Sequence, residues 1–481
     1  MVTPSGRAGV DLLLSHGYCL ADDEHERDVM MPYPPLGLLY LSSALKAAGA
    51  AVEVYDTTFG SVDGFRNRLA EARPAVVGLA TNLMTRAAVL RMIAVSREAG
   101  AWVVLGGPEA EPNAADYLWA GADVVVVGEG EATLEELCRH LPVHGRQRLE
   151  AVAGISYLDD GGRPRTTPPR PQVRPLSSLP WPDRDAVDMN RYLSAWRDHH
   201  GFASVSLVTS RGCPFTCTWC SHGVFGRSHR RREVAEVADE VEHILDRWAP
   251  ERLWYADDVF THNRPWTVAY AAELGRRGVR VPFECISRAD RIDDRVADAL
   301  ADMGCARLWI GSESGSQRVL DAMGRLATVE DIRAKTALLQ DRGIEVGMFL
   351  MLGYDGEEER DLAATVDHLK RAAPDVFLTT VAYPIRGTEY FDRVRGRIRA
   401  DRPWAERTDR DLRIAGRRSR RYYDHAGRWL VNEVNLALAW RRGSRDVPRL
   451  ARMLLAAGRG RLGMWLSRHE REAGAGREAA P

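Results

Sequence analysis

Short apolar runs alternate with amphipathic segments over the first 395 residues, a pattern typical of consecutive βαβ units. The first series predicts five strands, at residues 10–14, 51–55, 75–80, 101–105 and 123–127. Between and after these strands the pattern predicts five helices, at 36–48, 61–71, 85–98, 111–119 and 131–140. We therefore expect residues 1–145 to form a doubly wound, Rossmann-like α/β domain.

The periodicity fails over residues 146–200, where prolines and turn-forming residues predict a hairpin followed by an extended connector. A second series of six strands, each followed by a helical pattern, is predicted at 203–210, 251–256, 281–287, 306–312, 344–352 and 375–382. This series predicts a partial (β/α)6 barrel of the TIM type over residues 201–395. Residues 396–481 show only helical or irregular patterning, which predicts a basic helical C-terminal region.

The composition is that of a soluble globular protein, with 45% hydrophobic and 28% charged residues among 481. The seven cysteines are odd in number, and the first apolar stretch is too short to be a signal peptide or a membrane span. These features predict a protein of the reducing cytoplasm. The net charge of −1 conceals an uneven distribution, because residues 401–481 carry 19 Arg against 10 Asp and Glu.

Three of the cysteines lie within the stretch "RGCPFTCTWCSH", in the spacing C-x3-C-x2-C. This loop directly follows the first strand of the second series, and parallel barrels carry their chemistry at the C-terminal ends of their strands. Three thiolates can hold three irons of a [4Fe-4S] cluster and leave the fourth iron open to a substrate. A zinc site completed by His222 and three unconnected structural cysteines are the alternatives.

With its aromatic residue before the last cysteine, this loop resembles that of the radical S-adenosylmethionine (SAM) enzymes, and the resemblance covers the second domain. It implies that Cys213, Cys217 and Cys220 bind a [4Fe-4S] cluster and that SAM chelates the open iron. Reduction of the cluster would then cleave SAM to methionine and a 5'-deoxyadenosyl radical. The electron would come from an external donor of the flavodoxin or ferredoxin type.

Polar residues at the ends of the later strands fit a SAM pocket. Carboxylates after the second strand suit the SAM ammonium group. The fork of Arg288 after the third strand suits its carboxylate, and Glu313 after the fourth suits the ribose hydroxyls. The residues that the resemblance assigns to SAM are Trp219, Asp257, Asp258, Arg288, Glu313, Ser314 and Gly353. For each polar residue, a solvated loop position or a salt bridge at the barrel rim is the alternative.

The N-terminal domain has neither a G-x-G-x-x-G motif after its first strand nor a P-loop. The order of its loops resembles instead the cobalamin-binding domain that precedes the barrel in one subclass of radical SAM enzymes. The cobalamin-binding residues implied by this resemblance are Pro35, Gly37, Thr81, Asn82, Gly106, Gly107, Gly128 and Gly130. A ligand-free module that only packs against other parts of the chain is the alternative, because a fold alone does not establish a site.

Many cobalamin domains carry D-x-H-x-x-G, whose histidine coordinates cobalt, and this sequence lacks that motif. The stretch "DTTFG" keeps the aspartate and a glycine without the histidine. His16 stands alone after the first strand, and we expect it to be a surface residue rather than a cobalt ligand.

The resemblance implies an enzyme that methylates an unactivated carbon of a small-molecule or lipid-like substrate through methylcobalamin. Similar enzymes use the same cofactors for cyclisation or rearrangement without methyl transfer. Cys285 and Tyr383, near the third and sixth strand ends, are candidate catalytic donors of a proton or hydrogen atom, or else packed core residues.

Two other classes of protein are alternatives. A tRNA methylthiotransferase would carry a second cysteine triad near its N-terminus, where only Cys19 and Cys138 occur. A non-catalytic cobalamin or metal sensor would need no SAM-binding strand ends. Nucleic-acid binding is not expected, because no binding motif is present.

The C-terminal region mixes Leu, Met and Trp with Arg at roughly helical spacing. Periodic apolar stripes are usually buried, so we expect a helical cap on the barrel with an arginine-rich solvated face. Peripheral contact with an anionic membrane is the alternative.

Overall fold

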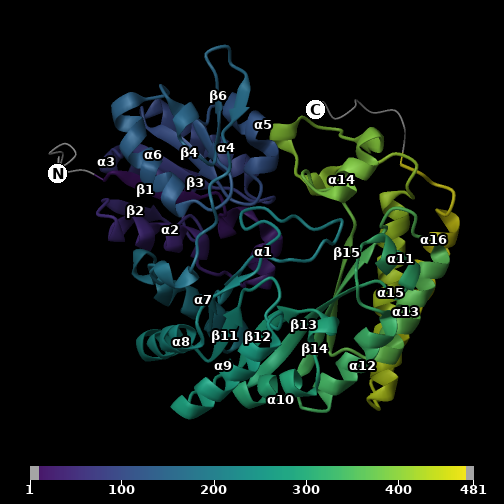
Figure 1. The fold of residues 1–481 in the computed structure, drawn as a ribbon. Coiled ribbons are helices and arrows are strands. Elements are labelled where there is room, and N and C mark those ends of the chain that lie inside the picture. Colours follow the sequence, from purple (N-terminus) through teal and green to yellow (C-terminus); the bar gives the residue numbers. More distant parts are fainter. Residues whose placement is uncertain (1–9, 473–481) are drawn as a thin grey trace. The chain divides into compact units, whose positions relative to one another are not determined.

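The computed structural model describes residues 10–472 (Figure 1). The chain divides into two compact units. The first contains residues 1–214, 221–254 and 404–408, and the second contains residues 215–220, 255–403 and 409–481. Each unit is described by itself below.

A seven-stranded sheet forms the centre of the first unit. Its order is β2-β1-β3-β4-β5-β6-β7, where the first five strands in the sequence run parallel and β6 and β7 are antiparallel additions. The strands are β1 (Leu12–His16), β2 (Val52–Tyr55), β3 (Val76–Ala80), β4 (Trp102–Gly106), β5 (Val124–Val126), β6 (Ile155–Leu158) and β7 (Pro164–Thr166).

Both faces of this sheet are covered, and each face has its own apolar core. Leu13 of β1 packs into one core, whereas its neighbours Leu12 and Leu14 pack into the other. Successive side chains of a strand point to opposite faces, so a strand buried on both faces is an unbroken apolar run. This is why the sequence pattern located the five parallel strands to within about two residues.

The helices of the first unit are α1 (Glu24–Val29), α2 (Leu36–Ala47), α3 (Val62–Ala72), α4 (Arg86–Glu98), α5 (Ala114–Trp119), α6 (Glu131–His144), α7 (Met189–His200) and α8 (Val234–Trp248). Two of them, α1 and α7, lie in segments for which no helix was predicted. The fully buried side chains of Tyr192 and Trp196 lie on α7, so packing rather than local periodicity stabilises this helix. The prediction of an uninterrupted connector up to residue 200 was wrong at this point.

The second series of strands gives a six-stranded sheet in the order β15-β14-β13-β12-β11-β8, in agreement with the predicted partial barrel. The strands are β8 (Ser204–Leu207), β11 (Arg252–Tyr255), β12 (Phe283–Ser287), β13 (Cys305–Glu313), β14 (Glu345–Leu352) and β15 (Val376–Val381). Two short antiparallel pairs complete the strands: β9 (Ser210–Arg211) with β10 (Arg230–Arg231), and β16 (Ile398–Arg399) with β17 (Arg413–Ile414).

The helices of the second unit are α9 (Arg264–Arg277), α10 (Asp294–Met303), α11 (Gln317–Ala322), α12 (Val329–Gln340), α13 (Glu359–Ala372), α14 (Glu389–Val394), α15 (Arg420–Arg441) and α16 (Val447–Leu466). The last two form an antiparallel hairpin, coloured yellow-green and yellow, in which α15 packs against α13 and α16 packs against α15 (Figure 1).

This hairpin corrects one expectation. The periodic apolar residues of α15 are buried as predicted. On α16 Met464 is buried, but several large apolar side chains, among them Leu454 and Leu455, are exposed. The stripe on α16 is therefore not part of a core.

A buried histidine of α13 contacts strand β13. His368 of α13 is fully buried, and its Nε2 lies 3.0 Å from the Ser312 hydroxyl of β13. Burial, helped by the positive charge of Arg333, lowers the pKa of His368 from 6.5 to about 4. The folded protein therefore holds this imidazole neutral at pH values where the unfolded chain protonates it.

We expect this difference to destabilise the fold in acid. The stabilisation is complete above pH 6.5 and is lost as the pH falls towards 4, by about 3 kcal/mol in total. Urea titrations across this range should therefore show a steeper loss of unfolding free energy for the wild-type protein than for His368→Asn, whose amide can still contact Ser312. Equal pH dependence of the two proteins would contradict this assignment.

Candidate cofactor-binding sites

The strand that leads into the cysteine loop is fixed by a network of buried charges. Arg211 donates from Nη1 to Glu129 and from Nη2 to Glu131, each at 2.7 Å. Arg230 donates to the other oxygen of Glu129, also at 2.7 Å. All four side chains are buried, and both glutamates belong to the "GEGEAT" loop at the C-terminal end of β5.

The network is stable only when all of its charged members are present. Burial opposes ionisation of Glu129, but hydrogen bonds from Arg211 and Arg230 outweigh that effect and hold the pKa of Glu129 below its ordinary value. A buried charge that loses its partner is strongly destabilising. The start of the cysteine loop is therefore attached to the loop after β5 by four groups that must all be present.

In the second unit, the thiol of Cys217 faces two buried guanidinium groups. Arg288 and Arg325 each place Nη1 3.6 Å from its Sγ. The guanidinium carbon of Arg288 also lies 3.8 Å from the ring centroid of Phe215, which fixes its position. Both N–H groups are therefore directed at the sulfur of one member of the cysteine triad.

Arg288 retains an unused donor. Its Nη2 is buried and has no hydrogen-bond partner within residues 10–472. A buried N–H without an acceptor is costly, so this atom marks a place for an anionic group. The carboxylate of SAM, assigned to Arg288 from the sequence, has the required chemistry.

The structure also places Glu313 in this cluster. Glu313 ends β13 with a left-handed φ of 62°, and its buried carboxyl group lies near Gly311 and Arg325. Burial raises the pKa of Glu313, and the charges of Arg325 and Arg288 counteract this rise. Sequence reasoning missed Arg325 because it follows α11 and does not end a strand.

The other residues assigned to SAM have varied surroundings. Asp257 is buried, whereas Asp258 is exposed. Ser314 is within 3.2 Å of the Thr365 hydroxyl on α13, so its side chain is directed at that helix. Of the two remaining residues, Gly353 is covered by the ring of Tyr423, and Trp219 packs against an apolar cluster that includes Met323, Tyr354 and Tyr390.

The two candidate catalytic residues are not equally accessible. Cys285 is completely buried beside Cys305, and burial raises the pKa of its thiol well above its ordinary value. It therefore has the surroundings of a core residue. Tyr383 is half-buried, and the guanidinium carbon of Arg410 lies 5.9 Å from its ring centroid.

Within residues 10–472, no three His, Cys, Asp or Glu side chains are grouped as ligands of one metal ion.

An apolar cavity of about 330 Å³ lies in the first unit between the sheet and helices α2 and α6. Leu14 of β1, Leu41 of α2 and Leu134 of α6 are among its lining residues. Five of the glycine and loop residues assigned to cobalamin also line it: Gly37, Gly106, Gly107, Gly128 and Gly130. The other three, Pro35, Thr81 and Asn82, do not.

The backbone at the mouth of this cavity requires glycine. Gly107 has a φ of 106°, and a side chain there would collide with the backbone of Thr81. The hydroxyl of Thr81 is already 2.9 Å from that of Tyr117, and Asn82 accepts from the backbone N–H of Met84. The polar groups of Thr81 and Asn82 are therefore used in contacts with the protein itself at this edge of the sheet.

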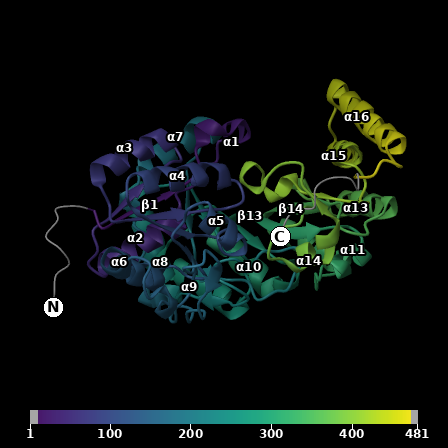
Figure 2. The ribbon, with the colours of Figure 1, turned by 90° about the horizontal axis from the view of Figure 1, so that it is seen from above.

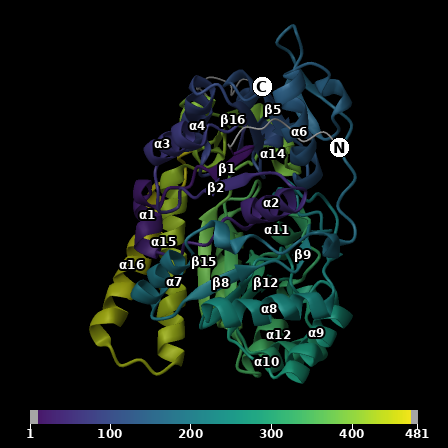
Figure 3. The same ribbon diagram turned by 90° about the vertical axis from the view of Figure 1, so that its left-hand side faces the viewer.

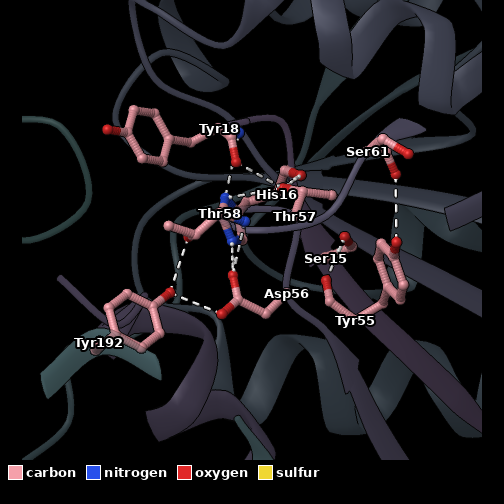
Figure 4. A network of polar contacts seen from close by, with 9 residues as sticks. All are labelled: Ser15, His16, Tyr18, Tyr55, Asp56, Thr57, Thr58, Ser61 and Tyr192. Carbon is pink, nitrogen blue, oxygen red and sulfur yellow. Dashed lines mark hydrogen bonds and ion pairs between the residues drawn. The ribbon is translucent and has the colours of Figure 1, made fainter. Parts of the chain in front are cut away.

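His16 is buried, which corrects the expectation of a surface residue. Its Nε2 lies 2.9 Å from Asp56, and its Nδ1 accepts from the backbone N–H of Tyr18 at 3.2 Å (Figure 4). Asp56 in turn accepts from Thr58 and from the hydroxyl of Tyr192. Because both ring nitrogens have partners, His16 has no lone pair directed at a metal.

The fold and these two sites define a class: a protein with a Rossmann-like domain, a partial barrel and a cysteine triad after its first barrel strand. The family model of the B12 binding domain matches residues 28–138, and that of the radical SAM superfamily matches residues 207–369. The chain belongs to the cobalamin-dependent radical SAM enzymes.

Curated relatives and a solved structure agree with this assignment. The chain is 28% identical to an uncharacterised methyltransferase of Pyrococcus horikoshii, over 75% of this chain and 78% of that protein. It is 26% identical to the anaerobic magnesium-protoporphyrin IX monomethyl ester cyclase of Rubrivivax gelatinosus, over 72% of this chain and 63% of the cyclase. The radical SAM methyltransferase TsrM from Kitasatospora setae, whose structure holds cobalamin and a [4Fe-4S] cluster, has a similar fold. The two structures match with a TM-score of 0.67 and 21% sequence identity, over 80% of this chain and 75% of TsrM.

The charge network generates a stability prediction. Glu129→Gln removes the negative charge between two buried guanidinium groups, so the free energy of unfolding should fall by about 3 kcal/mol in urea titrations. Glu135→Gln is the matched control, because Glu135 pairs with Arg139 on the surface of α6, and it should cost less than about 1 kcal/mol. Equal losses of unfolding free energy in the two variants would show that the buried network does not hold the start of the cysteine loop in place.

Proposed function

We propose that this enzyme binds a [4Fe-4S] cluster, SAM and cobalamin, and transfers a methyl group to an unactivated carbon of a small-molecule or lipid-like substrate. The observation that carries the proposal is the buried guanidinium of Arg288. It contacts the cluster cysteine Cys217 and keeps one buried N–H for an anionic ligand.

Cys213, Cys217 and Cys220 would each bind one iron, and SAM would occupy the fourth. Arg288 would bind the SAM carboxylate, while Arg325 and Arg288 stabilise the thiolate of Cys217. Glu313 is the ribose-binding candidate. Burial raises the pKa of Glu313, and the charges of Arg325 and Arg288 counteract part of this rise. Asp257 and Asp258 remain the candidates for the ammonium group.

The cavity under α2 and α6 fits the nucleotide tail of cobalamin. Its aliphatic walls match a dimethylbenzimidazole ring, and Gly106, Gly107 and Gly128 leave room for a ligand to approach the backbone. A tail held there would be separate from the corrin ring. His16 would not take its place, since its Nε2 faces Asp56 and its Nδ1 accepts from the backbone N–H of Tyr18.

Together the bound cofactors supply two reagents: a 5'-deoxyadenosyl radical and a methyl carrier. One SAM would donate the methyl group and leave S-adenosylhomocysteine. A second SAM, cleaved with one external electron, would give methionine and the radical that removes a hydrogen atom from the substrate. A second external electron would return the methyl carrier to the state that accepts a methyl group from SAM, so each turnover would consume two electrons. The methyltransferase names of the Pyrococcus protein and TsrM favour this use of the cofactors.

A second candidate function is radical cyclisation without methyl transfer. The similarity to the Rubrivivax cyclase, over 72% of this chain, favours it. The two reactions differ in what they consume, so they can be distinguished before the substrate is known in detail.

One prediction of the proposed function concerns the iron-sulfur cluster. Anaerobically reconstituted protein should bind one [4Fe-4S] cluster, and simultaneous Ala substitution of Cys213, Cys217 and Cys220 should abolish its absorbance. Cys285→Ala and Cys305→Ala are the controls and should retain it. Iron and zinc analysis completes the test, because stoichiometric zinc without iron-sulfur absorbance would refute the proposal.

The second prediction concerns the lower face of cobalt. In the cobalt(II) state, the bound cobalamin should show an electron spin resonance spectrum without nitrogen splitting, since neither its own base nor His16 is coordinated. His16→Ala should leave that spectrum unchanged. A spectrum that shows nitrogen coupling in the wild-type protein and loses it in the variant would make His16 the ligand.

The third prediction concerns stoichiometry. Each methylation should release one S-adenosylhomocysteine and one 5'-deoxyadenosine, after subtraction of SAM cleavage without substrate. Deuterium from the substrate should appear in the 5'-deoxyadenosine. Formation of 5'-deoxyadenosine with the true substrate but without matching S-adenosylhomocysteine would refute methylation and favour the cyclisation.

A further inference from the structure

The helix α16 packs against α15 through its small residues. Ala457, Gly460 and Gly463 are buried in this contact. A side chain at Gly460 would lie 2.6 Å from the backbone nitrogen of Trp429, and one at Gly463 would collide with the ring of His425. These glycines let the two helices approach closely, and the hairpin lies at the edge of its unit with α16 outermost (Figure 2).

The opposite side of α16 carries its large apolar residues. Leu454, Leu455, Leu462, Trp465 and Leu466 are between 56% and 62% exposed. Isolated exposed leucines are common, but five on one helix form a continuous patch. We call these five residues the outer face of α16.

Helical geometry places arginines along both borders of the outer face. At about 100° per residue, the five apolar side chains fall within about 120° of the helix circumference. Arg452 and Arg459 follow within about 40° on one side, and Arg461 precedes the face by about 20° on the other. Arg452 and Arg459 are exposed. Arg461 stacks over Trp429, with its guanidinium carbon 4.8 Å from the ring centroid.

The charge of this region is strongly positive. Residues 441–468 contain eight Arg and one acidic residue, Asp446. The turn that joins α15 to α16 lies at one end of the hairpin (Figure 3). It contains Arg442 and Arg445, and α15 ends just before it with Arg441 and with Trp440, which is 74% exposed. Apolar and cationic residues therefore occur together along α16 and the turn that precedes it.

We propose that the outer face of α16 docks on an anionic lipid membrane surface. An apolar stripe bordered by arginines matches the boundary between acyl chains and anionic headgroups, where the leucines leave water and the guanidinium groups meet phosphate. A second copy of the chain would bring the same positive charge to the same patch, which opposes self-association. Within residues 10–472 no helix is long and apolar enough to cross a membrane, so the contact is with the surface. This inference does not depend on the proposed reaction.

Vesicle sedimentation with the full-length protein tests the proposal. The protein should bind vesicles of equal parts phosphatidylcholine and phosphatidylglycerol at least about tenfold more tightly than vesicles of phosphatidylcholine alone. High salt should weaken this binding, because it screens the arginines. Equal binding to both vesicles, or binding to neither, would overturn the proposal.

Two variants separate the apolar and the charged contributions. The double variants Leu454→Glu with Leu455→Glu, and Arg452→Glu with Arg459→Glu, should each lower binding to the anionic vesicles by about tenfold or more. All four side chains are exposed, so thermal unfolding should be unchanged. Val143→Glu is the matched control, because Val143 is 73% exposed on α6, and it should bind as the wild-type protein does.

A dimer is the competing occupant of this face. Sedimentation velocity should show only monomers, both for the wild-type protein and for the leucine variant. A dimer that the leucine substitutions dissociate, without preferential binding to anionic vesicles, would overturn the proposal and assign the outer face to a second copy.

Discussion

Four buried charges hold the chain where its chemistry begins. Arg211 lies two positions before Cys213, and it is bound by Glu129 and Glu131, which follow β5. Arg230 closes the network from β10. Such a cluster is costly to bury and adds little net stability compared with apolar packing, but it admits only one arrangement of its members. The glycine-rich loop at the cavity and the first residues of the cysteine loop are thereby fixed together.

A second set of charged side chains surrounds the thiol of Cys217. Arg288 and Arg325 each place an N–H group against this sulfur, and both moderate the effect of burial on the pKa of Glu313. Low dielectric strengthens these interactions, and it also makes an unpaired donor expensive. The buried Nη2 of Arg288 has no acceptor among residues 10–472, so this donor is free for a ligand.

The two ends of the chain use glycine and hydrophobicity in opposite ways. In the N-terminal domain, glycines leave a cavity with apolar walls open to a ligand. In the C-terminal hairpin, Gly460 and Gly463 allow helices to touch, which turns the leucines of α16 outward. The same residue types thus create a pocket in one place and an exposed apolar face in the other, and the neighbouring element decides which.

The amino-acid sequence by itself determined the series of βα units, the cysteine triad and most of the strand-end residues. Period, spacing and turn chemistry are local properties, so they can be read without knowing what packs against what. Only the tertiary structure decided that Arg325 joins Cys217, that His16 is buried against Asp56, that α7 is a helix and that the apolar stripe of α16 is exposed. Each of these depends on a partner distant in the sequence, and burial is a property of the pair rather than of either residue alone.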